Sequence, residues 1–202
     1  MPSIQRPWYA CASKLFFLLL LSFPAQAGGP DSITLPSVAS DKAVTTAVKM
    51  MVSAANPHAA KAGLEILKAG GSAVDAALAI QLMLTLVEPQ SSGIGGGGFL
   101  MYYDAATKTV SAYDGRETAP AAATPALFLD ENGEPRKFFD AVMGGKSVGV
   151  PGILRLFELA HAVHGKLPWA QMFAPGIALA DNGFEVSERL HFLLNYDLSR
   201  LT

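Results

Sequence analysis

The stretch "SSGIGGGGFLMYYDAATKTVSAYDGRETAP", residues 91–120, decides the fold of this chain. Gly93, Gly95 and Gly98 match G-x-G-x-x-G, the pattern of a dinucleotide-binding turn. That turn needs a strand before it and a helix after it, so that the helix N-terminus meets the phosphates. Here a helical apolar pattern precedes the glycines and an alternating strand pattern follows them. The order of elements therefore argues against a dinucleotide site.

Five glycines between residues 93 and 98 still require a reason. Glycine permits positive φ angles and a close approach of backbone to backbone or to a ligand. Two interpretations stay open. The run is either a tight helix-to-strand crossover with a packing role, or it presents backbone N–H groups to an oxyanion.

Two other glycine or serine motifs are absent. The residues "GGKS" at 144–147 do not belong to a P-loop, because Asp140 occupies the position of the first glycine in the P-loop pattern. Ser91, Ser92 and Ser147 have no G-x-S-x-G context, so none of them is a candidate nucleophile.

The segments before the glycine run predict a strand and two helices. Residues 49–56 are expected to form a short strand. Asn56 and Pro57 then supply an N-cap and a first-turn proline for a helix that stops at Gly70. Ser72 and Asp75 have capping-box spacing, and they begin a second helix, 73–87, with almost no polar face. We expect this second helix to be buried on nearly all sides.

The segments after the run predict a hairpin and further helices. Residues 99–104 and 109–114 alternate like two antiparallel strands. Helical patterns follow at 151–165, at 168–182 and from 187 to the end. This order is not a repeated strand–helix alternation, so it favours an α+β fold with helix and sheet layers over a parallel nucleotide-binding sheet.

Arg116 is the sharpest candidate for a binding residue. It lies at the end of the second predicted strand, in "DGRETAP", beside Asp114 and Glu117. An arginine at a strand end can offer a bidentate fork to a carboxylate. The alternative is a structural ion pair with Asp114, Glu117 or another acid, which spacing alone favours.

Three polar residues on one helical face are candidates for part of a metal site. Glu158, His161 and His164 lie three positions apart, but no second cluster supplies the remaining ligands. We therefore expect a solvated helix end, with His164 near the C-terminal dipole, and no metal.

The first 27 residues have the features of a secretory signal peptide. Arg6 and Lys14 precede the apolar run 15–23, and "PAQA" ends at Ala27. The run is short of the ~20 residues that span a bilayer, so an uncleaved anchor is the weaker alternative. Cleavage would remove Cys11, the only cysteine, and leave an exported protein without disulfides. Residues 28–42 are expected to form a flexible mature N-terminus.

The bulk composition fits one packed domain. Half of the 202 residues are hydrophobic, and 15 Lys and Arg stand against 17 Asp and Glu. This balance indicates neither a nucleic-acid nor a membrane-surface partner.

Three segments together resemble the γ-glutamyltransferase (γ-glutamyl transpeptidase) family. They are "MVSAANPHAAKAGLEILKAGGSAVDAALAIQLMLTLVEPQSSGIGGGGFLMYYD", "YDGRETAPAAATPALF" and "SVGVPGILRLFELAHAVHGKLPWAQMFAPGIALADNGFEVS". The resemblance is to the N-terminal portion of the large subunit, and it places that portion at residues 43–202. It implies a four-layer αββα N-terminal-nucleophile hydrolase sandwich, only partly present in this chain.

The resemblance also implies a chemistry. Family members cleave themselves into large and small subunits, and the threonine that begins the small subunit attacks the γ-amide of glutathione or another γ-glutamyl compound. The arginine of the "RETAP"-like motif binds the substrate α-carboxylate, and it corresponds to Arg116. Thr202 does not begin a chain, so we expect no catalytic residue in this sequence. The resemblance also implies that no cofactor is needed and that the fragment is inactive without its small subunit.

Two hypotheses from different classes remain. One is a fragment of a γ-glutamyltransferase, or of a related acylase that acts on β-lactam side chains. The other is an exported domain without catalytic activity, either a remnant or a binding domain.

Overall fold

The structure of the chain, a computed structural model, describes residues 44–201, and residues from Thr45 onward form one unit. The expected signal peptide and mature N-terminus lie outside the described residues. The helices are α1 (Pro57–Lys68), α2 (Ala73–Val87), α3 (Phe138–Val142), α4 (Ile153–His164), α5 (Ala174–Asn182) and α6 (Glu188–Leu201). The strands are β1 (Gly98–Asp104) and β2 (Thr109–Gly115), and two short 3-10 helices are η1 (Gly145–Ser147) and η2 (Trp169–Met172).

The starts of α1 and α2 follow from their capping residues. The Asn56 side chain accepts a hydrogen bond from the backbone N–H of His58 at 3.0 Å, with Pro57 in the first turn. Ser72 and Asp75 form the predicted capping box, because each side chain accepts the backbone N–H of the other. Such caps satisfy N–H groups that have no partner within the helix. These predicted boundaries are confirmed.

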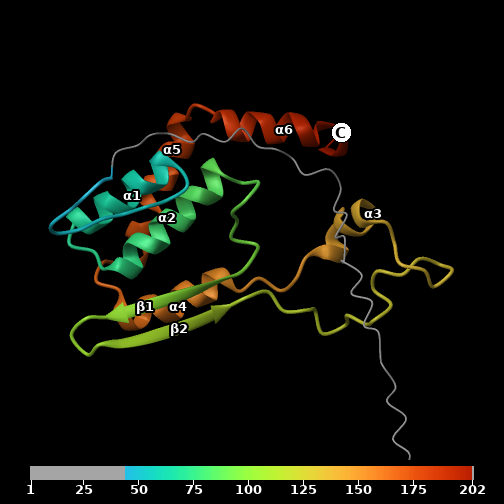
Figure 1. Cartoon of the computed structure of the whole chain (residues 1–202), viewed down its shortest axis with the longest axis horizontal. Coiled ribbons are helices and arrows are strands. Elements are labelled where there is room, and N and C mark those ends of the chain that lie inside the picture. Colours follow the sequence, from blue (N-terminus) through green and yellow to red (C-terminus); the bar gives the residue numbers. More distant parts are fainter. Residues whose placement is uncertain (1–43, 202) are drawn as a thin grey trace, which may run out of the picture. The chain divides into compact units, whose positions relative to one another are not determined.

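Helix α2 is the centre of the apolar core, as its sequence predicts. Leu78 is fully buried, and it packs in one cluster with Leu156 of α4 and Met172 of η2. Figure 1 shows α1 and α2 next to each other above the β1–β2 hairpin, with α4 lying along the sheet. The core therefore lies between the helices and one face of the hairpin.

The hairpin has one face against the core and one bare face. The strands pair antiparallel as predicted, with Leu100 opposite Tyr113 and Met101 opposite Ala112. Leu100 and Tyr113 pack against the core. Because successive side chains alternate across a strand, the outer face carries the exposed residues Phe99, Met101, Tyr103 and Val110.

The expected strand at residues 49–56 is wrong. The structure gives this segment no β-bridge within residues 44–201, although it packs on the α1–α2 pair through Ala54. That packing involves only part of the apolar pattern, because Met50 and Met51 are exposed within the described residues. A strand needs a ladder of backbone hydrogen bonds as well as an apolar pattern.

The second half of the chain mostly follows its patterns. Helix α4 begins two residues after Pro151 and ends before Gly165, and Gly183 stops α5, as expected. The pattern at 168–182 divides into η2 and α5, and the short helix α3 was not expected. No helix within residues 44–201 is both long enough and apolar enough to cross a membrane.

Candidate functional site

Arg116 follows the last residue of β2 and is held at both its backbone and its side chain. Its backbone N–H donates a 2.9 Å hydrogen bond to Oδ1 of Asp114. Its guanidinium Nη1 lies 3.1 Å from Oε2 of Glu117, so Glu117 is the ion-pair partner and Asp114 is a backbone acceptor. The Arg116 side chain is 59% exposed. Its remaining N–H donors can therefore reach a ligand.

An open pocket of about 350 Å³ adjoins Arg116. The segment after β2 forms one wall, and the segment around η1 forms another. The lining residues include two cations, Arg116 and Lys146, and one carboxylate, Glu117. The other lining residues are Thr118, Ala119, Pro120, Leu127, Phe128, Ser147, Val148 and Gly149. The excess of one positive charge suits an anionic group such as a carboxylate.

The glycine run forms a close backbone contact with the Arg116 segment. A Cβ atom on Gly97 would lie 2.4 Å from the carbonyl oxygen of Gly115, a distance that real Cβ contacts do not reach. The carbonyl of Gly96 accepts hydrogen bonds from the backbone N–H groups of Gly152 and Ile153, at 3.1 and 3.2 Å. The packing role of the run is confirmed, with α2 before it and β1 after it. The oxyanion role stays a prediction.

Glu117 connects this run to the arginine pocket. A second pocket, of about 330 Å³, lies along the run and is also lined by Glu117. Its other lining residues are Gln81, Pro89, Ser91, Ser92, Gly93, Gly95, Gly96 and Gly97. The Glu117 carboxylate therefore lies between two pockets, a position that its place in the sequence does not reveal.

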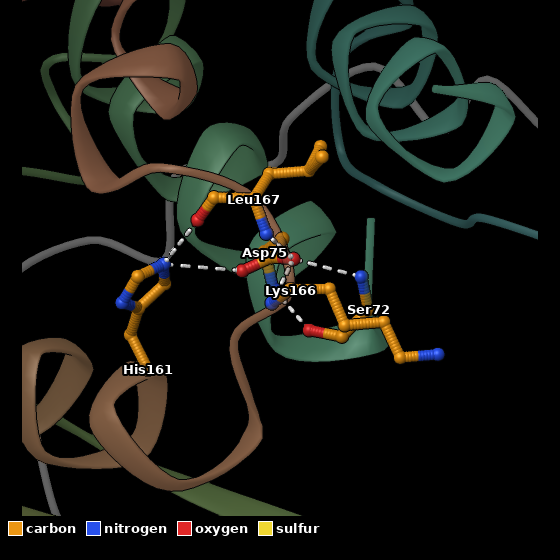
Figure 2. Close-up of polar contacts among 5 residues, drawn as sticks. All are labelled: Ser72, Asp75, His161, Lys166 and Leu167. Carbon is orange, nitrogen blue, oxygen red and sulfur yellow. Dashed lines mark hydrogen bonds and ion pairs between the residues drawn. The ribbon is translucent and has the colours of Figure 1, made fainter. Parts of the chain in front are cut away.

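A second cluster of titratable side chains centres on Asp75, which is fully buried. Its Oδ2 accepts hydrogen bonds from the backbone N–H groups of Ser72, Lys166 and Leu167, at 2.8, 2.9 and 3.2 Å. Figure 2 shows these donors around the carboxylate, with His161 on the other side. Burial raises the pKa of the Asp75 carboxyl, but the hydrogen bonds outweigh burial and hold that pKa below its usual range. The cluster pins the loop after α4 to the start of α2.

The expectation of a solvated helix end for Glu158, His161 and His164 is wrong for the two histidines. Nε2 of His161 lies 2.9 Å from the carbonyl oxygen of Leu167, and the side chain is 17% exposed. Nε2 of His164 lies 2.8 Å from the hydroxyl oxygen of Tyr113 on the inner face of the sheet. Helix α4 lies against the sheet and α2, so the face that carries the two histidines is covered. Only Glu158 is exposed, and it pairs with Arg155.

The structure thus separates the candidate residues into two groups. Arg116 and the glycine run come together through Glu117, whereas Asp75 and His161 belong to the core contact between α2 and α4. Sequence reasoning named Glu117 only as an ion-pair partner and Asp75 only as a cap. Within residues 44–201, no three His, Cys, Asp or Glu residues gather as metal ligands would.

A family comparison agrees with these motifs. The sequence model of the family described as Gamma-glutamyltranspeptidase matches residues 59–202. Among curated proteins, the glutathione hydrolase proenzyme of Bacillus subtilis (strain 168) is 42% identical over 191 residues, which cover 93% of this chain. The chain spans 32% of that relative's length.

Solved structures show the same similarity in three dimensions. The gamma-glutamyltranspeptidase of Helicobacter pylori matches with a TM-score of 0.72 and 33% identity, over 78% of this chain and 45% of that one. A cephalosporin acylase from Bacillus halodurans matches with a TM-score of 0.59 and 29% identity, over 80% of this chain and 31% of that one.

Proposed function

Because this chain belongs to the gamma-glutamyltranspeptidase family, we propose that it is the N-terminal part of the large subunit of a γ-glutamyltransferase. The enzyme would cleave the γ-glutamyl amide of glutathione and related compounds, and transfer the γ-glutamyl group to water, amino acids or peptides. One observation carries this proposal. Arg116, half exposed at the end of β2, lines an open pocket with an excess of positive charge.

The proposed role of Arg116 is to bind the α-carboxylate of the donor. A guanidinium presents paired N–H donors that match the two oxygens of a carboxylate. A charge-assisted contact of this kind contributes about 1.5–3 kcal/mol. Since the α-carboxylate lies away from the scissile γ-amide, this contact supports binding of the donor in ground state and transition state alike.

The catalytic residue in this proposal is a threonine outside the chain, at the start of the small subunit. Its hydroxyl oxygen attacks the γ-carbonyl carbon while its own α-amine takes the hydroxyl proton. The γ-amide C–N bond then breaks, and the departing amine receives that proton. Water or an acceptor amine attacks the resulting ester, which releases glutamate or a new γ-glutamyl amide and restores the threonine. No metal or cofactor enters this scheme.

The proposed fold is the four-layer αββα sandwich, with this chain supplying part of it. The bare outer face of the hairpin supports the proposal, because Phe99, Met101, Tyr103 and Val110 form an apolar surface suited to a second sheet. The small subunit of the same precursor is the expected partner. The name proenzyme, printed for the Bacillus subtilis relative, is consistent with such processing. Residues 1–27 would direct export and 28–42 would begin the mature protein, whether periplasmic or secreted.

The similarity to a cephalosporin acylase supports a second candidate, a related enzyme that hydrolyses β-lactam side chains. An exported domain without activity is the remaining alternative. The α-carboxylate of a γ-glutamyl donor gives Arg116 a partner, so the pocket favours the transferase.

The test is an assay of the protein expressed from its complete gene, with a chromogenic γ-glutamyl anilide and a cephalosporin as alternative substrates. We expect release from the anilide, and in Arg116→Ala a KM raised by about tenfold or more with a smaller change in kcat. Activity confined to the cephalosporin would overturn the transferase assignment. Absence of both activities would favour the inactive domain.

A further inference from the structure

Glycines from two segments that are distant in the sequence contact the Glu117 side chain. A Cβ on Gly97 would lie 2.7 Å from Oε2 of Glu117, and a Cβ on Gly96 would lie 3.2 Å from Oε1. On the other side, a Cβ on Gly149 would lie 2.9 Å from the Cβ of Glu117. Glycine at these positions leaves the space that the glutamate side chain fills. These glycines restrict where the Glu117 carboxylate can lie.

The Glu117 carboxylate is deeper in the protein than its partner. The Glu117 side chain is 29% exposed against 59% for Arg116. Its Oε2 is buried and accepts no hydrogen bond from the described residues. The Arg116 guanidinium is the described cation that reaches this oxygen, at 3.1 Å. A cationic partner stabilises a buried carboxylate oxygen. The Glu117 carboxylate, whose position is restricted, therefore attracts the Arg116 guanidinium.

The pairing uses one edge of the guanidinium and leaves the others. Arginine has five N–H donors in a rigid plane, and only Nη1 is recorded within ion-pair distance of Glu117. An exposed arginine without an anchor samples several rotamers and loses entropy when it binds a ligand. Anchoring one edge lowers that entropic cost, since the guanidinium is already ordered before the ligand arrives.

We propose that Glu117 is a positioning residue, which holds the Arg116 guanidinium so that its free donors receive the α-carboxylate of the donor substrate. The inference rests on the proposed function and adds a residue to it. The glycines at positions 96, 97 and 149 contribute to this positioning, because they confine the glutamate that orients the arginine.

The test compares Glu117→Gln with Arg116→Ala and with the double variant, in the protein expressed from its complete gene. The substrates are a γ-glutamyl anilide and the matching 4-aminobutyryl anilide, which lacks the α-carboxylate. We expect Glu117→Gln to raise KM for the first by about fivefold with kcat within about twofold, as for loss of a partly exposed ion pair. KM for the second substrate should not change. In the Arg116→Ala background, Glu117→Gln should have no further effect on KM.

A merely structural role predicts a different result. Glu117→Gln would then lower the melting temperature, impair both substrates alike and add to the effect of Arg116→Ala. Glu158→Gln is the matched control, because it breaks an exposed arginine–glutamate pair on α4 and should leave both KM values unchanged.

The inference and the function fail in distinguishable ways. If the wild type is active and Arg116→Ala raises KM while Glu117→Gln does not, the positioning role is wrong and the function stands. If the wild type lacks γ-glutamyl activity, both fall. Should Glu117→Gln fail to fold, Glu117→Asp keeps the charge and shortens its reach. It is then expected to raise KM for the carboxylate-bearing anilide alone, and an unchanged KM would overturn the inference.

Discussion

Oδ1 of Asp75 at the start of α2 lies 3.4 Å from Nε2 of His161 in α4, and the other oxygen of the same carboxylate holds the loop that follows α4. One carboxylate therefore joins three segments: the first turn of α2, the imidazole of His161 and the backbone of Lys166 and Leu167. The contact becomes an ion pair when the imidazole is protonated. Figure 2 shows how these partners surround Asp75.

Asp75→Asn is expected to destabilise the protein by about 2–3 kcal/mol at pH 7, because an amide is a weaker acceptor for three backbone N–H donors and its own N–H groups lack partners. Urea unfolding followed by circular dichroism measures the change. Asp130→Asn is the matched control, since Asp130 also accepts backbone hydrogen bonds but lies in an exposed loop. Equal shifts of the unfolding midpoint in the two variants would contradict a special role for Asp75.

The same carboxylate predicts an acid dependence. The pKa of Asp75 in the folded protein is held below its ordinary value of 3.8, so its contribution to the free energy of unfolding is complete above that value. The contribution is lost as the pH falls from 3.8 through the folded pKa, because the unfolded state then binds the proton more readily. The stability difference between wild type and Asp75→Asn should therefore shrink below pH 3.8. A constant difference from pH 7 to pH 2.5 would contradict this assignment.

Gly97→Ala should destabilise the protein by about 1–3 kcal/mol or more, as overpacked sites do. The new Cβ would lie 2.4 Å from the carbonyl oxygen of Gly115, which is backbone and has no side-chain rotation to relieve the contact. Gly95→Ala in the same run is the control, because nothing lies within 4 Å of its Cβ position. Melting temperatures of the two variants test this, and equal values would refute the close-approach role.

Leu78→Ala should cost about 2–5 kcal/mol, because Leu78 is fully buried at the centre of the core cluster and truncation leaves a cavity. Leu78→Met preserves most of the volume and should cost less than about 1.5 kcal/mol. Urea unfolding of both variants gives the comparison. If Leu78→Ala lowered the free energy of unfolding no more than Leu78→Met does, the core would have relaxed to fill the cavity.

Met101→Glu tests whether the outer face of the hairpin is covered in the protein expressed from its complete gene. Met101 is 69% exposed within the described residues. A second sheet over this face would bury the new carboxylate, and burial of an unpaired charge should lower the melting temperature and the activity together. Ala105→Glu adds the same charge in the hairpin turn and should have little effect. Wild-type behaviour of both variants would count against the sandwich.

Local features of the fold were predictable from the sequence, because their cause lies within a few residues. Asn56 and Ser72 cap their helices through neighbours two and three positions away. The hairpin follows from alternation in two adjacent segments. The strand expected at 49–56 was wrong, because an apolar pattern gives no information about a pairing partner, and Ala54 of this segment packs on α1 and α2 instead.

Long-range contacts were not predictable in this way. The capping box identified Asp75, but nothing near it in sequence indicates Lys166 or His161 as a partner. The position of Arg116 at a strand end identifies it as a candidate, but its proposed role comes from the family resemblance. The glycines that confine Glu117 come from residues 96–97 and 149, and only folding brings those segments together.

The carbonyl oxygen of Gly115 has consequences for protein engineering. Cβ atoms on Gly97 and Gly152 would lie 2.4 and 2.3 Å from this one atom, so two segments meet at it without room for a side chain. A mutant library aimed at changing the donor specificity of the proposed transferase should therefore keep all three glycines fixed. Diversity belongs at exposed positions of the pocket wall, Lys146 and Val148, where side chains can change while the frame that carries Arg116 stays intact.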